Sequence, residues 1–368
     1  MLGNTIGVAF RVTSFGESHG RCMGVVVDGC PAGLKLSGGD VQRDLDRRRP
    51  SQSSISTSRA EKDRVEILSG LFNGFTTGAP LCMLVWNRDV DSTPYERRRW
   101  TPRPGHADYT AYVRYGGFND YRGGGRFSGR ITAGYLMAGA VAKRLLKLYG
   151  IEILAHTKRI GETIARETTV NEIRENVETN LVRCADPEAS EKMTDAIKRA
   201  AAEMDSLGGE VECIALGIPP GVGQPVFDTL EGDLAKAILS IPSVKSVEFG
   251  AGTGFSRLRG STSNDQYIVE EGRVLTETNR AGGVLGGISS GMPVTCRVTF
   301  KPTPSIGKPQ KTVDLTLIEE TILEVKGRHD PCIVPRAVPV VEGMVAVVLV
   351  DHMIQAGLIK QVLGKGTS

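Results

Sequence analysis

A glycine triplet flanked by arginines constrains the fold of this chain more than any other segment. It lies within residues 121–130, whose sequence is YRGGGRFSGR, and a stretch of small residues with helical periodicity follows from Ile131. Glycine lets the backbone approach a ligand closely, and backbone amides at the start of a helix attract anions. Arg126 and Arg130 can add charge-assisted hydrogen bonds. The segment therefore predicts an anion-binding loop in front of a core helix, with a plain glycine-rich linker as the alternative.

The overall glycine and charge content agrees with a small anionic ligand. The chain has 45 glycines in 368 residues, well above the usual share of about 7%. The formal net charge is only +3, and the arginines form local clusters rather than a long basic track. Aromatic residues that could stack on bases make up only 5% of the chain. We expect a small-molecule partner and no nucleic acid.

Cysteine and histidine spacing excludes further classes of protein. The seven cysteines are an odd number without a C-x-x-C pair, which predicts neither a disulfide framework nor a zinc site and favours the reducing cytoplasm. The five histidines have no i, i+4 pairing, so we expect no metal. The N-terminus lacks a basic segment followed by an apolar stretch, and no apolar run reaches the roughly 20 residues that span a bilayer. We therefore expect no membrane association.

Hydrophobic periodicity predicts a mixed chain of the α+β class. Apolar, β-rich runs predict strands at residues 24–27, 65–68, 81–86, 211–216 and 294–300. Amphipathic periodicity predicts helices at residues 40–48, 131–149, 170–182, 191–204 and 230–239. No low-complexity linker divides the chain.

Two strand-to-helix connections resemble each other. Residues 29–33 read GCPAG and residues 217–221 read GIPPG, and each segment follows a predicted strand and precedes a predicted helix. An ancient internal duplication would explain the similarity. Two turns that independently selected proline and glycine would explain it equally well.

Three further segments combine glycine or proline with groups that exchange protons or bind anions. Residues 16–20 (GESHG) place His19 in a loop, where it could donate a proton or could simply serve as a structural hydrogen-bonding group. Residues 46–50 (DRRRP) end a short helix with three arginines, of which at most one or two can face a ligand. Residues 103–108 (RPGHAD) hold another arginine and another histidine in a loop that proline stiffens.

The C-terminal half contains three weaker signals. Residues 281–291 (AGGVLGGISSG) lack the G-x-G-x-x-G spacing of a dinucleotide-binding loop, which argues against a Rossmann domain. Residues 301–305 (KPTPS) offer an ammonium group and two hydroxyls that could contact phosphate. Residues 327–332 (GRHDPC) bring arginine, histidine and aspartate together, although a simple turn with aspartate before proline is the alternative.

Taken in order, the motifs at residues 16–20, 46–50, 103–108 and 327–332, with residues 121–130 as a fifth, resemble those of chorismate synthase. The similarity extends from Gly3 to His352. It implies a single domain over residues 1–368 in which helices are sandwiched between antiparallel β-sheets, and a homotetramer.

The resemblance also implies an activity. Members of this family perform a 1,4-anti elimination of phosphate from 5-enolpyruvylshikimate-3-phosphate to give chorismate, the last step of the shikimate pathway. They require reduced FMN, although the reaction has no net redox change. The flavin is thought to lend electron density and to accept the C6 hydrogen at N5. NADPH is implied only as a reductant of the flavin in some members.

The matched motifs carry implied residue roles. His19 would protonate the departing phosphate, His106 would lie by the flavin N1 edge and Asp330 would assist proton transfer at N5, with Ser18 and Ser128 ordering that network. The positions that match substrate-binding arginines are Arg48, Arg103, Arg130 and Arg328. The positions that match flavin contacts are Arg126, Phe127, Ser128, Gly286, Lys301, Pro302, Thr303, Pro304, Ser305 and again Arg328.

The sequence departs from the family pattern at three positions. Ser54 stands where many members have a substrate-contacting arginine, and Phe127 and Gly129 replace a serine and an alanine of the flavin loop. Two other functions are compatible with arginine in glycine-rich loops. A flavin oxidoreductase acting on a phosphorylated metabolite is the first, and a noncatalytic anion-binding or RNA-binding protein is the second, which the low aromatic content disfavours.

Overall fold

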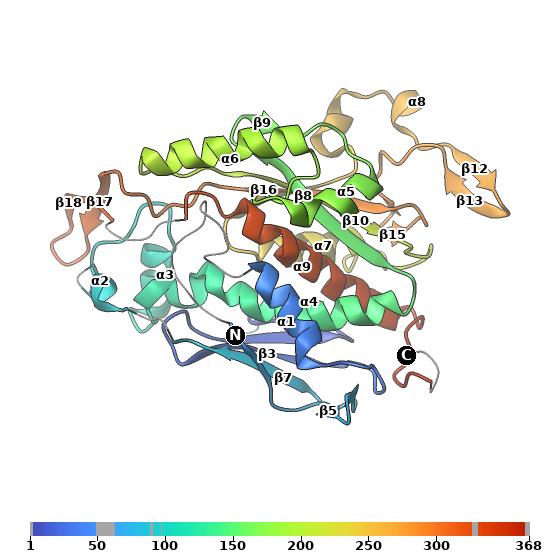
Figure 1. The fold of residues 1–368 in the computed structure, drawn as a ribbon, viewed down its shortest axis with the longest axis horizontal. Coiled ribbons are helices and arrows are strands. Elements are labelled where there is room, and N and C mark those ends of the chain that lie inside the picture. The colour runs from blue at the N-terminus through green and yellow to red at the C-terminus, as the bar shows by residue number, and fades with distance from the viewer. Residues whose placement is uncertain (1–2, 49–62, 89–90, 97, 326–329, 365–368) are drawn as a thin grey trace.

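Two antiparallel sheets with helices between them form the body of the protein (Figure 1). We analysed a computed structural model, which describes residues 3–48, 63–88, 91–96, 98–325 and 330–364. The first sheet has the order β1 (Thr5–Ile6), β2 (Arg11–Gly16), β3 (Cys22–Asp28), β7 (Leu81–Trp86), β4 (Val65–Ile67). The second has the order β11 (Val244–Phe249), β16 (Val294–Phe300), β10 (Gly209–Leu216), β8 (Glu152–Ile160), β9 (Thr163–Ile164). The predicted α+β sandwich is therefore confirmed.

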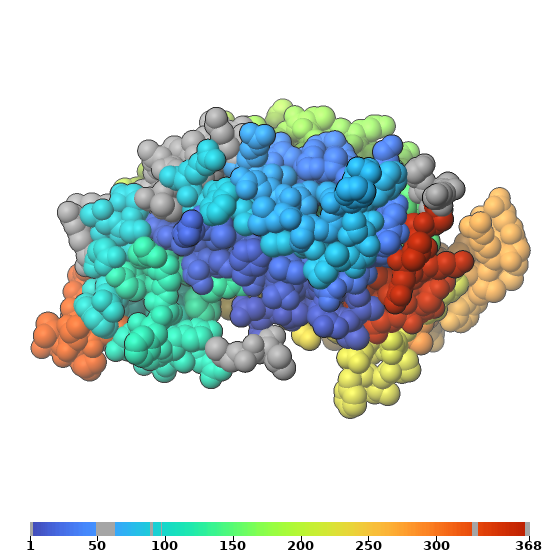
Figure 2. Space-filling view, turned by 90° about the horizontal axis from the view of Figure 1, so that it is seen from below, coloured from blue at the N-terminus to red at the C-terminus, as the bar shows by residue number. Residues whose placement is uncertain are grey.

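The helices fall into inner and peripheral groups. Between the sheets lie α1 (Gly38–Arg48), α4 (Thr132–Lys147), α7 (Leu230–Leu239) and α9 (Val334–Gln355). The outer face of the second sheet carries α5 (Val170–Asn176) and α6 (Pro187–Ala202), whereas the first sheet itself forms the face seen in Figure 2. At one end are α2 (Thr93–Glu96) and α3 (Asp108–Tyr115). Small peripheral elements are β5 (Leu71–Phe72), β6 (Phe75–Thr76), α8 (Gly260–Ser263), β12 (Tyr267–Glu270), β13 (Arg273–Thr276), β14 (Val284–Leu285), β15 (Ile288–Ser289), β17 (Gln310–Asp314) and β18 (Glu319–Leu323).

Most predicted elements are present with shifted ends. Every predicted strand is observed, and the predicted helix at residues 230–239 matches α7. The predicted helix at residues 170–182 ends earlier, because α5 gives way to a 3₁₀ turn at Val177–Thr179. The predicted helix at residues 191–204 begins earlier, because the Asp186 side chain caps the amides of Glu188 and Ala189.

The chain contains the same topology twice. Four strands of the first sheet, taken in chain order, lie in the spatial order first, second, fourth, third: β2, β3, β7, β4. The second sheet repeats that order with β8, β10, β16, β11. In both halves a helix follows the second strand (α1, α7) and a long helix follows the fourth (α4, α9). This repeat supports the internal duplication.

The two similar turns have the same backbone conformation. Gly29 and Gly217 have φ angles of 83° and 78°, and Gly33 and Gly221 have φ angles of 93° and 96°. These values lie in the left-handed region that glycine enters without a steric penalty. The glycines at both ends of each turn are therefore required by the same local geometry in the two halves.

The two long helices cross at a pair of glycines that belong to equivalent helices of the repeat. A Cβ built on Gly139 of α4 would lie 2.4 Å from the Cα of Gly343 in α9, so no side chain fits there. By length and composition α9 could cross a membrane, but 94% of its most apolar window is buried inside the protein. It serves as the central core helix, packed against α4, α7 and β8.

Gly139→Ala is expected to lower the free energy of unfolding by about 1–3 kcal/mol, because overpacking at a backbone contact forces the two helices apart. The cost should exceed the roughly 1 kcal/mol that alanine contributes through helix propensity. Denaturant unfolding measures the change. Gly260→Ala is the matched control, since its Cβ would meet no atom within 4 Å. Equal stability of the two variants would contradict the close crossing.

Candidate active site

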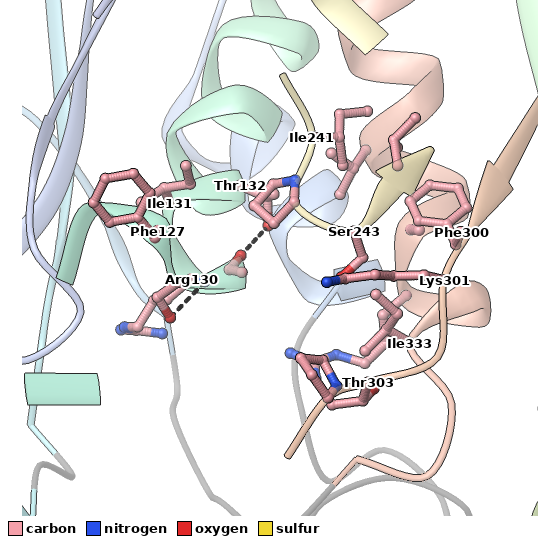
Figure 3. Close-up of a pocket in the computed structure, with 18 of the residues that line it drawn as sticks. Phe127, Arg130, Ile131, Thr132, Ile241, Ser243, Phe300, Lys301, Thr303 and Ile333 are labelled. Carbon is pink, nitrogen blue, oxygen red and sulfur yellow. Dashed lines mark hydrogen bonds between the residues drawn. The ribbon is translucent and has the colours of Figure 1, made fainter. Parts of the chain in front are cut away.

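A cavity of about 560 Å³ opens where the start of α4, the end of α7 and the start of α9 meet (Figure 3). This volume lies in the range of roughly 300–1,000 Å³ that is typical of ligand pockets. Of the predicted site residues, the cavity is lined by Arg48, His106, Arg126, Phe127, Ser128, Arg130, Lys301, Thr303, Pro304 and Asp330. The structure thus brings together segments that are as much as 282 positions apart, from residue 48 to residue 330.

The lining has a strong positive charge. Cationic side chains come from Arg48, Arg126, Arg130, Lys245, Lys301 and Arg336. Asp330 is the single carboxylate among the described residues that line the cavity. Burial and the nearby Lys245 lower the pKa of Lys301, so these two cations repel each other. The cavity is therefore suited to a ligand with several negative charges.

Apolar side chains form the remainder of the lining. In Figure 3, Phe127 and Ile131 lie across the cavity from Phe300. Further apolar residues in the lining are Leu239, Ile241, Ile333, Ala337 and Val340. Such a surface can cover a flat ring system while the cations hold its charged groups.

Two of the predicted substrate arginines share one buried carboxylate. Asp63 Oδ1 lies 2.8 Å from Arg130 Nη1, and Asp63 Oδ2 lies 3.3 Å from Arg48 Nη1. Arg48 is held further by the Thr132 hydroxyl, which accepts from its Nε at 2.7 Å. All these groups are buried. Because their donors are oriented in advance, less side-chain entropy is lost when an anion binds.

Of the three consecutive arginines, the two that the structure describes point in different directions, as their spacing on a helix predicts. Arg47 turns inward and pairs with the buried Glu342 of α9, whereas Arg48 lines the cavity. Arg49 lies outside the described residues, as do Ser54 and Arg328.

The glycine triplet makes a sharp 3₁₀ bend. Gly123, Gly124 and Gly125 all have positive φ angles, and a Cβ on Gly123 would lie 2.1 Å from the His19 ring. The Ser128 side chain accepts from the Arg130 amide at 3.3 Å and caps the turn that leads into α4. The triplet therefore lets His19 pack closely, and the residues that follow it line the cavity.

Arg126 is oriented by backbone groups of the first sheet. Its guanidinium donates to the Gly16 carbonyl at 2.9 Å and to the Ser14 carbonyl at 3.2 Å. The same group donates to Asn4 Oδ1 at 2.9 Å. Arg126 thus joins the strand before the His19 loop to the cavity wall.

His106 is neutral at physiological pH in this environment. Its Nε2 lies 3.0 Å from Ser305 Oγ. Burial, followed by the charges of Arg103 and Lys301, lowers the pKa of His106 to about 4. A neutral imidazole adds no further repulsion to the cationic cavity, and an arriving anion would favour its protonation.

We expect NMR titration of the ligand-free protein to give a His106 pKa near 4, assigned with a His106→Gln variant. Because this folded-state pKa lies below the ordinary value of 6.5, His106 should reduce the stability of the fold as the pH falls from about 6.5 towards 4. A His106 pKa at or above 6.5 in the free protein would contradict the buried, cation-rich environment.

Asp330 is the carboxylate residue of the cavity lining. Arg336, at the start of α9, pairs with Asp330 Oδ2 and also donates from Nε to the Arg48 carbonyl at 3.1 Å. Asp330 Oδ1 is buried and has no hydrogen-bond partner among the described residues. A buried acceptor of this kind is usually satisfied by a ligand or by water.

Six predicted residues lie behind the cavity wall or apart from it. His19 Nδ1 lies 3.0 Å from Ser92 Oγ, and the amide of Ser18 donates to the Gly125 carbonyl at 3.3 Å. Arg103 forms an ion pair with Asp108 at 2.8 Å, and its Nη1 donates to Ser305 Oγ at 3.4 Å. The remaining three residues outside the lining are Pro302, Ser305 and Gly286.

Gly286 lies at the far end of α7 from the cavity. The neighbouring Gly287 carbonyl accepts from the Leu230 amide at the start of α7, whereas Leu239 at the end of α7 lines the cavity. The structure therefore does not bring Gly286 together with the other predicted flavin contacts within one chain.

Sequence reasoning missed four residues of this site. They are Asp63, Asn87, Lys245 and Arg336. Asp63 is the first described residue after the gap at residues 49–62, and it belongs to none of the five motifs. Arg336 follows Pro335 at the start of a helix, so a basic residue beside a proline-marked helix start was the available signal.

Comparisons with known proteins agree with this site. Residues 10–354 match the family described as chorismate synthase. A chorismate synthase of Dehalococcoides mccartyi is 54% identical over 362 residues, which cover 98% of this chain and all of that protein. One of Methanocella arvoryzae is 56% identical over 98% of this chain and 97% of that protein. A crystal structure of chorismate synthase superposes with a TM-score of 0.76 at 29% identity, covering 95% of this chain and 93% of the other.

The fold and the cavity define an α+β enzyme whose site suits small polyanions. The chain belongs to the chorismate synthase family, whose members are lyases of aromatic amino-acid biosynthesis.

Proposed function

We propose that this protein eliminates phosphate from 5-enolpyruvylshikimate-3-phosphate to give chorismate, in a 1,4-anti reaction that needs reduced FMN. The observation that carries the proposal is the cavity itself, which combines six cationic side chains with an apolar wall. The substrate has a phosphate and two carboxylates, so it matches the charge of the cavity. The C3–O bond would break with its electron pair leaving on phosphate, while the hydrogen at C6 is removed.

Arg48 and Arg130 are the proposed substrate anchors. Both are buried, and both are oriented by Asp63. A guanidinium binds phosphate or carboxylate through two parallel hydrogen bonds, and exclusion of water strengthens such bonds. Arg103 and Arg328 are proposed as further anchors on the basis of their motifs. Arg103 would have to exchange part of its pairing with Asp108 for the substrate.

The residues present are suited to a flavin. Phe127 and Ile131 could cover a ring system, and Lys301 with Thr303 could bind its phosphate. Asp330 Oδ1, which has no hydrogen-bond partner in the described part of the chain, offers an acceptor for a ring N–H. Reduced FMN would supply electron density for the loss of phosphate and a site for the C6 hydrogen. NADPH is proposed only as a possible reductant of the flavin.

Three groups are proposed to move protons. His19 would donate to the departing phosphate, and the contact between its ring and Gly123 places it directly behind the loop that leads to the cavity. His106, neutral in the free protein, could take up a proton when anions bind. Asp330 would accept and return a proton at Oδ1, with Arg336 holding Oδ2.

A cytoplasmic homotetramer of single-domain chains is part of the proposal. The position of Gly286 supports it, because the ten-residue helix α7 separates Gly286 from the cavity by about 15 Å. In a tetramer, Gly286 could contact the flavin of a neighbouring subunit.

Mixing Gly286 variants with active-site variants should then restore activity in the hybrid tetramers. An isolated monomer with full activity would contradict this arrangement.

The activity can be tested by anaerobic incubation with 5-enolpyruvylshikimate-3-phosphate and chemically reduced FMN. We expect chorismate and phosphate in equal amounts. Parallel reactions should use oxidised FMN and no flavin, and both should lack product. Equal turnover in those reactions would contradict the proposed cofactor, and no product in any reaction would contradict the proposed function.

A further inference from the structure

We propose that Asn87 is a positioning residue that couples the His19 loop to the substrate anchor Arg130. Asn87 directly follows β7, an inner strand of the first sheet. It belongs to none of the motifs that predict the site. The inference rests on the proposed function, because it assigns Asn87 a part in the same reaction.

The side chain of Asn87 uses both ends of its amide. Its Nδ2 donates to the Glu17 carbonyl at 3.0 Å and to the Gly20 carbonyl at 2.8 Å, which are the carbonyls on either side of Ser18 and His19. Its Oδ1 accepts from Arg130 Nε at 2.6 Å. Two carbonyls on one side and an N–H on the other allow only one orientation of the amide.

The connection is specific to the side chain. The Asn87 backbone is anchored separately, because its amide donates to the Arg21 carbonyl at 3.0 Å and continues the pairing of β3 with β7. A substitution at this position should therefore leave the strand in place. It removes only the bridge between the His19 loop and the guanidinium.

The bridge also determines where Arg130 points. Its Nε donates to Asn87 and its Nη1 forms an ion pair with Asp63, so these two contacts orient the guanidinium. Without Asn87, Arg130 would lose the hydrogen bond at its Nε. The His19 loop would lose two of its hydrogen bonds in the same step, so substrate binding and proton donation should change together.

Asn87→Asp separates the two functions of the amide. The carboxylate can still accept from Arg130, but its second oxygen faces two carbonyl oxygens and repels them. Protonation of that oxygen restores one donor. We expect turnover to fall by about 10- to 100-fold at pH 8, with partial recovery, relative to the wild type, as the pH is lowered towards 6. Asn87→Ala should also raise KM for 5-enolpyruvylshikimate-3-phosphate by about tenfold, without recovery at low pH.

The matched control is Asn279→Asp. The Asn279 side chain also donates to a backbone carbonyl, that of Pro293 at 2.8 Å, but it does not line the cavity. It should lose stability without a change in kcat, KM or pH profile. If Asn87→Ala and Asn87→Asp lower only the melting temperature and match the control in kinetics, Asn87 is merely structural and the inference is wrong. If the wild type itself forms no chorismate, the proposed function fails instead.

Discussion

His19→Ala is expected to lower turnover by about 10²- to 10⁴-fold, the usual contribution of a general acid, while FMN binding stays within a few-fold of the wild type. The imidazole packs on Gly123 and bonds to Ser92, so it touches the loop that leads to the cavity rather than the proposed flavin wall. Steady-state kinetics and flavin titration by absorbance measure the two quantities separately.

Ser92→Ala provides the control for His19. It removes the hydrogen bond at Nδ1 but leaves the imidazole in place, so it should cost much less than His19→Ala. Circular dichroism should show that both variants fold. A loss below tenfold in His19→Ala would identify the imidazole as a structural hydrogen-bonding group. Excess phosphate should not restore the activity of His19→Ala, because this variant lacks a proton donor.

Glu342→Ala is expected to lower the free energy of unfolding by about 3–5 kcal/mol, because it removes the most buried member of an ion-pair network. Glu342 lies in the middle of α9, 4% exposed, and pairs with Arg47 of α1 and Lys143 of α4. Asp44 and Glu178 also pair with these cations but are more exposed than Glu342, so they compensate only part of the loss. Denaturant unfolding followed by circular dichroism measures the loss.

Glu342 should also make the free energy of unfolding depend on pH. Its pairing with Arg47 and Lys143 outweighs burial and lowers the pKa of Glu342 to about 2. Because this folded-state pKa is below the ordinary 4.5, the stabilisation is present above pH 4.5 and is lost as the pH falls from 4.5 towards 2. The difference between wild type and Glu342→Ala should shrink over that interval. Glu188→Ala is the control, since its pair with Lys192 is exposed and should contribute less than about 1 kcal/mol. An equal loss in both variants would contradict the buried network.

The largest element that sequence reasoning missed is α9. Its valine-rich composition favours a strand by propensity, and Pro339 removes a helical donor from its interior. Burial on nearly all sides outweighs this preference. The missing bond is compensated as well, because Arg183 donates to the Pro335 carbonyl at 2.8 Å, the acceptor that a residue at position 339 would otherwise use. Neither effect can be inferred from local sequence patterns, since both depend on distant segments.

The cavity was predictable where a motif carries its own chemistry. The segments around Arg48, His106, Arg130 and Lys301 all reach the lining. Residues that act through other residues carried no comparable signal. Asp63 matters because two arginines converge on it, and that convergence requires α1 and the start of α4 to be adjacent in space.

The sequence could likewise suggest the internal repeat but could not establish it. The GCPAG and GIPPG segments hinted at duplication, but ordinary turns could produce the same residues. The shared strand order of the two sheets and the matching φ angles at both pairs of glycines distinguish these two explanations, because independent turns would not place equivalent helices after equivalent strands.

The proposed chemistry is tested most directly by counting products against flavin. In an anaerobic reaction with limiting reduced FMN, we predict many molecules of chorismate per flavin, with the absorbance spectrum of the flavin still that of the reduced form at the end. One product per flavin, accompanied by accumulation of oxidised FMN, would show that the protein is an oxidoreductase acting on a phosphorylated substrate and would contradict the proposed elimination.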